Sequence, residues 1–153
     1  METEIFDSLM KTYLANIHSA LKISEIISSH GNESELSEDS IIIGLIYRLM
    51  TPMDEKEIDD SLEHSTNIYD SIIYGSDSDS DSDSDEGSVE EVKCPLIQNK
   101  EYRKLRVNNC NCDICIRARV CILNYKDYES NDSLSQRFKD SISTTCSTHK
   151  III

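Results

Sequence analysis

The residues of this chain best suited to chemistry are its cysteines, together with one histidine close to the C-terminal end. Three of the six cysteines fall within six consecutive positions, as Cys110-x-Cys112-x-x-Cys115, and a second pair follows as Cys146-x-x-His149. Two-residue spacing lets both members of a pair face one ion, and thiolate and imidazole are ligands that tetrahedral Zn²⁺ prefers. The sequence therefore predicts a zinc site formed by Cys112, Cys115, Cys146 and His149.

Other ligand sets and other roles stay open for these thiols. Cys94 and Cys110 are the alternative ligands for the same ion. In a second interpretation every cysteine is an ordinary packing residue. In a third, Cys112 and Cys115 form a dithiol-disulfide couple at the start of a helix, as in oxidoreductases. The second Cys/His pair favours metal binding, because a redox couple does not require it.

These ligands need elements that bring them together, and the C-terminal sequence supplies two helical patterns. Apolar residues recur at intervals of three and four over 114–128, which predicts a helix that starts at the cysteine cluster. A shorter helix is predicted over 132–142. Leu105 and Val107 alternate with charged residues, which indicates an edge strand.

The first 74 residues carry three further helical patterns. The first helix is predicted from Thr3, as its cap, to a stop at His30-Gly31. A run over 41–50, capped by Ser37 or Asp39, is apolar on nearly every side and predicts a helix buried on most faces. Thr51-Pro52 marks the start of a third helix that ends at Gly75. The first helix is expected to bury one stripe: Phe6, Leu9, Tyr13, Ile17, Leu21, Ser24 and Ile27. Three histidines lie among polar residues, apart from other candidate ligands in the sequence, and are assigned no role: His18, His30 and His64.

Charge divides the chain into three segments. Residues 1–74 have a net charge of -11, residues 75–92 of -8 and residues 93–153 of +5. The predicted organisation is therefore an acidic helical bundle, a disordered acidic linker and a small basic α(+β) module stabilised by zinc, so the fold is mainly α. A bundle this small has a limited core, so we expect it to dock on a protein partner or to self-associate.

The linker contains a strict serine-aspartate repeat that cannot bury apolar surface, which predicts an extended, disordered chain. Most of its serines have acidic residues one and three positions downstream, the environment that acidophilic kinases favour. Phosphorylation would add negative charge to the linker. The modified linker could then mimic a nucleic-acid backbone and compete with nucleic acid for the basic segment that follows. A plain solvated spacer is the alternative. The candidate phosphorylation sites are Ser76, Ser78, Ser80, Ser82 and Ser84.

The basic segment could bind a polyanion such as nucleic acid through phosphate contacts that weaken with salt. The candidate residues are Lys100, Arg103, Lys104, Arg106, Arg117 and Arg119. In the competing interpretation the protein is structural or an adaptor, and these side chains neutralise its own acidic segments.

Composition excludes several classes of protein. The chain has four glycines and lacks a phosphate-binding loop, an HExxH helix and a GxSxG elbow, so a non-enzymatic protein is expected. The apolar runs are too short for a membrane span, and the first residues do not form a secretory signal. An intracellular protein of the cytoplasm or nucleus is expected. The 21 isoleucines against 3 alanines indicate an AT-rich genome, as in large DNA viruses, so a viral protein of host cell or virion is one possibility.

Overall fold

A computed structural model describes residues 1–75 and 101–153 of the chain. Nearly all of the predicted acidic linker lies outside the described residues, and so do the five candidate phosphorylation sites, Cys94 and Lys100. The described part contains five helices and one short pair of strands, which confirms the prediction of a mainly α protein. None of the helices in these two ranges is long and apolar enough to cross a membrane.

Helix α1 (Glu2–His30) ends where the sequence predicts. The N–H of Gly31 donates to the carbonyls of Ile27 (3.0 Å) and Ser28 (3.1 Å), which closes the last turn. The predicted cap at Thr3 is wrong, because the helix already begins at Glu2 and Met1 occupies the cap position without a side-chain hydrogen bond.

The buried side of α1 also differs from the prediction. Its buried residues begin only at Ala15 and include Ala20 and Ser24, whereas Phe6 and Leu9 of the predicted stripe are exposed. Small residues are buried here because α2 (Glu38–Met50) crosses α1 very closely. A Cβ on Gly44 of α2 would collide with Ser24 Oγ and stand 2.5 Å from the carbonyl oxygen of Ala20.

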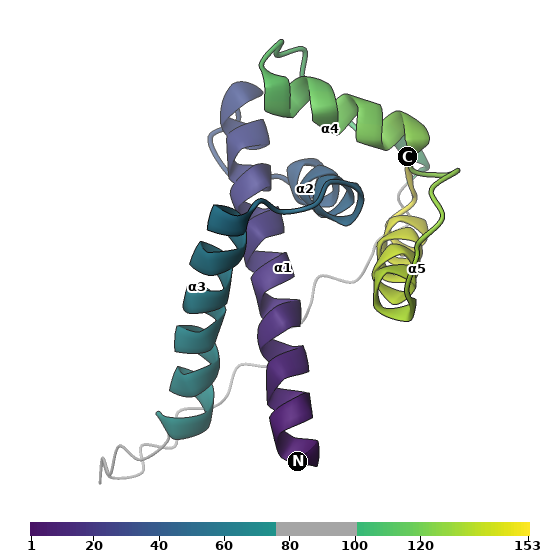
Figure 1. Ribbon diagram of the computed structural model, residues 1–153. Coiled ribbons are helices and arrows are strands. Elements are labelled where there is room, and N and C mark those ends of the chain that lie inside the picture. Colours follow the sequence, from purple (N-terminus) through teal and green to yellow (C-terminus); the bar gives the residue numbers. More distant parts are fainter. Residues whose placement is uncertain (76–100) are drawn as a thin grey trace, which may run out of the picture.

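Helix α2 (Glu38–Met50) is the central element of the fold. Ser37 caps it and accepts the N–H of Ser40 at 3.1 Å, which confirms one of the two predicted caps. Ile43 faces a cluster shared with both α1 and the C-terminal segment, whereas Ile46 faces a second cluster, whose other buried residues all come from α2 and the C-terminal segment. This two-sided packing explains why the helix is apolar all round (Figure 1).

Helix α3 (Glu55–Tyr74) packs antiparallel beside α1 (Figure 1). Its cap is Asp54, which accepts the N–H of Glu57 at 2.8 Å, while the Glu57 carboxylate accepts the N–H of Asp54 at 3.0 Å. The Thr51-Pro52 pair therefore precedes the helix instead of starting it.

The C-terminal segment forms β1 (Arg103–Lys104), α4 (Asp113–Asn124), α5 (Ser133–Thr148) and β2 (Ile151–Ile152). The two strands pair in parallel, so the predicted strand exists, two to three residues earlier than expected. Helix α5 is capped by Asp132 and continues six residues beyond the predicted end at Ile142. That extension places Cys146 inside the helix.

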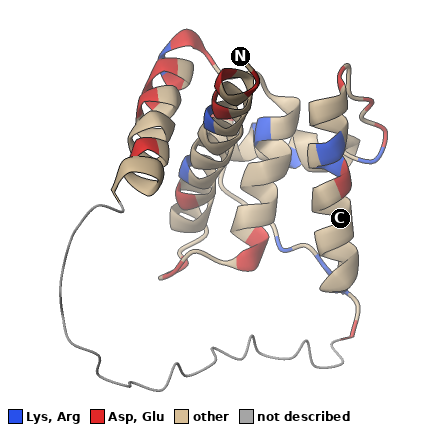
Figure 2. Ribbon diagram, turned by 90° about the horizontal axis from the view of Figure 1, so that it is seen from below, with Lys and Arg blue, Asp and Glu red and all other residues tan. Residues whose placement is uncertain are grey.

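Both buried clusters contain residues from before and after the undescribed segment. One joins Ile42 and Ile46 to Cys121, Tyr125 and Ile142, and the other joins Ile23 and Ile27 of α1 to Cys115 and Ala118 of α4. The segments predicted as separate modules therefore share their apolar interior. Charge is still uneven, because Asp and Glu gather on α1 and α3 and Lys and Arg are more frequent on the C-terminal elements (Figure 2).

Candidate metal centre

Four potential metal ligands converge where the end of α1 meets the start of α4. They are the last residue of α1, His30, and three cysteines from the loop and first turn of α4: Cys110, Cys112 and Cys115. Their ligand atoms all lie within 4.8 Å of one another, so the group could hold a metal ion. Cys115 is buried, Cys110 and Cys112 are half-buried, and His30 is exposed.

The imidazole of His30 stands over the three sulfurs at similar distances. Its Nδ1 lies 3.2 Å from Sγ of Cys112, 3.4 Å from Sγ of Cys110 and 3.5 Å from Sγ of Cys115. One nitrogen and three sulfurs at such distances can surround a single ion, with Nδ1 as the ligating atom of the histidine.

The start of α4 positions the sulfurs. Cys112 is the N-cap of the helix, and its Sγ accepts the backbone N–H of Cys115 at 3.4 Å. The backbone N–H of Cys112 in turn points to Sγ of Cys110 at 3.5 Å. A helix N-terminus carries partial positive charge and unpaired N–H groups, so thiolates are stabilised there.

Asn108 connects the two sides of the cluster. Its Nδ2 donates to the carbonyl oxygen of Ile27 in the last turn of α1 at 3.0 Å and to Sγ of Cys115 at 3.4 Å. Its Oδ1 accepts the N–H of Cys110 at 3.2 Å. Arg119 donates to the backbone oxygen of Asn108 at 3.0 Å. These bonds fix the loop in place and orient the ligands, as partners behind a metal ligand do.

The thiols differ in acidity. The backbone N–H of Cys115, with smaller contributions from the neighbouring thiols and His30, lowers the pKa of Cys112 to about 6. Burial is the main cause that raises the pKa of Cys115 to about 11. Cys112 is thus more readily deprotonated than Cys115, and a bound cation would favour the thiolate form of the other cysteines as well.

The structure brings together only part of the predicted ligand set. Cys112, Cys115 and the alternative ligand Cys110 belong to the cluster. Cys146 does not, because the longer α5 carries it into the same buried cluster as Cys121, where burial raises the pKa of its thiol. His149 follows α5 as its C-cap, away from the three sulfurs.

The fourth potential ligand of the cluster, His30, was missed by sequence reasoning. Its position immediately before Gly31, at the end of a helix, was the one available signal. That signal places the imidazole at a helix terminus but does not say which distant residues it faces.

The predicted nucleic-acid-binding residues fall into two groups. Lys104, Arg106 and Arg117 are exposed. Arg103 instead pairs with the buried carboxylate of Asp39, with Nη1 2.8 Å from Oδ1, and Arg119 is bonded to Asn108 as described above. Two of the predicted side chains thus serve internal contacts.

No protein-family model, no curated protein and no solved structure matches this chain.

Proposed function

We propose that this protein is a non-enzymatic interaction protein whose fold is stabilised by one structural zinc ion. The ion would be bound by His30, Cys110, Cys112 and Cys115. The nearly equal distances from His30 Nδ1 to the three sulfurs, 3.2 to 3.5 Å, carry the proposal. In a tetrahedral site with ordinary Zn–N and Zn–S bonds, nitrogen and sulfur are about 3.6 Å apart. Small movements of the side chains would complete that geometry.

The number and origin of the ligands support a structural role. Four protein donors fill the tetrahedron, whereas catalytic zinc keeps one position for water or substrate. The ion would link the end of α1 to the start of α4, between residues 80 or more positions apart in the sequence. It would therefore hold the two segments around their shared interior.

Nucleic-acid binding is a second candidate, favoured by the exposure of Lys104, Arg106 and Arg117. Three phosphate contacts would give weak binding that falls with salt. A salt titration of DNA and RNA binding should use the full chain, because the C-terminal segment shares its core with α1 and α2. Binding that is lost when all three residues are replaced by alanine supports this role. Absence of binding at low salt would instead favour a structural or adaptor protein that does not bind nucleic acid.

The decisive experiment is elemental analysis of protein purified under reducing conditions. We expect about one zinc per chain. We expect its loss in His30→Ala and in Cys112→Ser, and its retention in the matched controls His149→Ala and Cys146→Ala. Loss in the two control variants with retention in His30→Ala would overturn the proposed ligand set. Metal-free protein with a measurable thiol-disulfide potential would favour an oxidoreductase that uses Cys112 and Cys115.

A further inference from the structure

The N-terminal half of α1 is only partly covered by the rest of the protein. Helix α1 has 29 residues and α2 has 13, which correspond to about 43 Å and about 20 Å. Helix α2 therefore reaches less than half of α1, and the buried residues of α1 begin at Ala15. Along residues 2–14, α3 is the helix that lies beside α1 (Figure 1).

The contacts with α3 define which side of this half is open. Asp7 accepts a hydrogen bond from Tyr69, and Lys11 pairs with Asp70 at 3.6 Å. Ile5, Phe6 and Leu9 lie on other sides of the helix and are 65%, 57% and 48% exposed. With Tyr13 they form an apolar surface, here called the open face of α1, at the three- and four-residue spacing of a helix-packing stripe.

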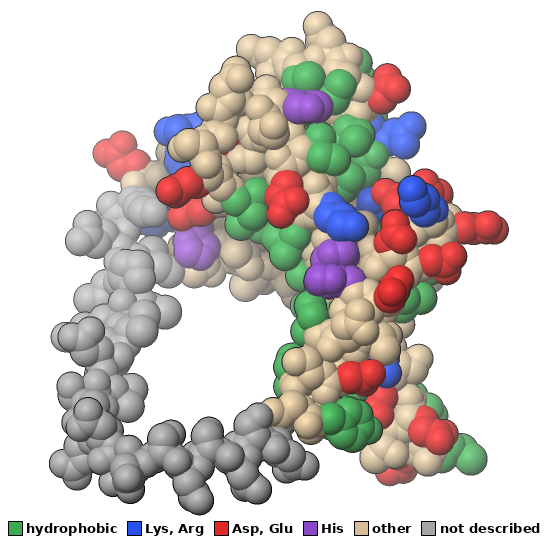
Figure 3. Space-filling model, turned by 90° about the vertical axis from the view of Figure 1, so that its left-hand side faces the viewer, with side chains coloured by type: hydrophobic (Ala, Val, Ile, Leu, Met, Phe, Trp, Pro, Cys, Tyr) green, Lys and Arg blue, Asp and Glu red, His purple; other side chains and the backbone are tan. Residues whose placement is uncertain are grey.

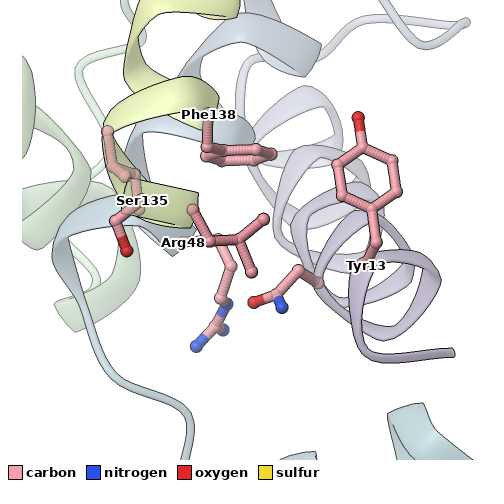
Figure 4. A pocket seen from close by; sticks show the side chains of 7 residues that line it. Tyr13, Arg48, Ser135 and Phe138 are labelled. Carbon is pink, nitrogen blue, oxygen red and sulfur yellow. The ribbon is translucent and has the colours of Figure 1, made fainter. Parts of the chain in front are cut away.

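Two hollows between α1 and α5 extend the open face toward the C-terminal half of α1. Tyr13 and Phe138 line both of them. The first, of about 90 Å³, also contains Arg48 and Ser135, and Figure 4 shows Tyr13 from α1 and Phe138 and Ser135 from α5 around it. The second, of about 110 Å³, is lined by Ile17 and other apolar side chains. Each is the size of one apolar side chain, so a partner could insert anchors there but not a whole helix.

Charge indicates which partner fits. The charged side chain on the open face of α1 is the carboxylate of Glu2, because Glu4 lies seven residues before Lys11 and therefore on the side that faces α3. Figure 3 shows the other side of the molecule, the one that bears α3, where carboxylates outnumber basic groups. A second copy of this chain, with its net charge of -14, would be repelled, whereas a cationic partner would be attracted.

We infer that the open face of α1 and the two hollows beside α5 bind one amphipathic helix of a partner protein, with an apolar stripe flanked by Lys and Arg. Its stripe would pack along Ile5, Phe6 and Leu9, and two of its apolar side chains would enter the hollows beside Phe138. Helix-in-groove binding of this kind uses anchors at i, i+3, i+4 and i+7. The inference rests on the proposed role as an interaction protein, but it does not depend on the metal.

The test uses the full-length, metal-loaded protein and a synthetic helical peptide with leucine at i, i+3, i+4 and i+7 and lysine elsewhere. Binding is followed by fluorescence anisotropy, and a scrambled peptide of the same composition controls for bulk charge. Leu9→Asp should weaken binding about ten- to hundredfold, since it removes one buried apolar contact. Leu123→Asp, the same change at an 80% exposed position on α4, should leave it unchanged.

Three results would overturn the inference. One is equal binding of the patterned and scrambled peptides, and another is equal affinity in the Leu9→Asp and Leu123→Asp variants. The third is self-association that Leu9→Asp abolishes, without peptide binding, because the occupant would then be a second copy. Zinc content is measured in the same samples. A zinc-replete protein that fails to bind contradicts the docking site alone, and a folded protein without zinc contradicts the metal proposal alone.

Discussion

The two ends of α1 lie in very different surroundings. Residues 15–30 pack against α2, α3 and α4 and end at the cysteine cluster, whereas residues 2–14 touch α3 and leave much of their apolar surface exposed. One continuous helix thus runs from a densely packed junction to a sparsely covered end. Packed interior and exposed apolar surface are therefore separated along a single helix, and we expect stability to differ in the same way, since local stability follows buried apolar contacts.

Removal of the metal should produce the largest difference between the two ends. Chelation under reducing conditions should lower the melting temperature by about 10 °C or more, because metal binding energy is folding energy. Amide hydrogen exchange should accelerate in residues 23–30 and 108–124 and change little in residues 2–14, which are already weakly protected. Unchanged amide exchange at the cysteine cluster after complete chelation would contradict the proposal that a metal ion links α1 to α4.

Truncation of one isoleucine in each region should sharpen the contrast. Ile46→Ala removes a side chain that is 0% exposed in the shared interior and should cost about 2 to 5 kcal/mol of unfolding free energy. Ile72→Ala, at a 65% exposed position near the end of α3, should stay within about 0.5 kcal/mol. Urea denaturation of both variants measures the difference, and similar losses would mean that the sparse end is also covered in solution.

Glycine substitutions test how closely the packed region is fitted. Gly44→Ala pushes a methyl group against Ser24 and Ala20 and should destabilise the protein by about 1 to 3 kcal/mol. Gly31→Ala is the matched control, since its new Cβ would come no closer than 3.4 Å to another atom and its φ of -87° suits alanine. The control should be neutral or slightly stabilising. Equal denaturation midpoints for both variants would contradict the close crossing of α1 and α2.

The smallest effect is expected from pH, at the contact between α1 and α3. His18 stacks on His64 with ring centroids 3.9 Å apart. Burial, followed by the neighbouring His64 and Lys22, lowers the pKa of His18 below 6.5, against a weaker opposing effect of Glu25. The folded state then binds fewer protons than the unfolded state, so this contribution is present above pH 6.5 and is lost as pH falls below it.

His64→Gln should reduce that pH dependence, because it removes the charge that opposes protonation of His18. The measurement is the urea midpoint of wild type and variant at pH 7.5 and at a pH below 6. The difference between the two proteins isolates the histidine pair from proton uptake by the cysteine cluster. An identical pH response in both proteins would contradict this assignment.

Local signals in the sequence predicted most of the elements. Gly31 ends α1, Ser37 caps α2 and Asp132 caps α5, because a cap depends on a few adjacent residues. The cap of α3 was misplaced, since Asp54 with Glu57 competes successfully with Thr51-Pro52. Each of these features depends on hydrogen bonds between residues only a few positions apart.

Contacts between distant residues could not be predicted in this way. The spacing of large apolar residues put Phe6 and Leu9 inside, but the close approach of Gly44 selects small residues for the interface instead. The same limit applies to the metal cluster. The cysteine spacing singled out two members of this cluster as ligands and a third as an alternative, whereas the proximity of His30 depends on how α1 and α4 meet.

That meeting has an electrostatic direction. The last carbonyls of α1 carry partial negative charge beside the proposed cation, and the first N–H groups of α4 carry partial positive charge beside the thiolates. Both helix macrodipoles therefore favour the same distribution of charge at the junction. A redesigned chain with the thiolates at the end of α1 and the imidazole at the start of α4 would oppose the dipole of α1 and leave the dipole of α4 without its anion, so we expect the order of the ligands along the sequence to contribute to metal affinity.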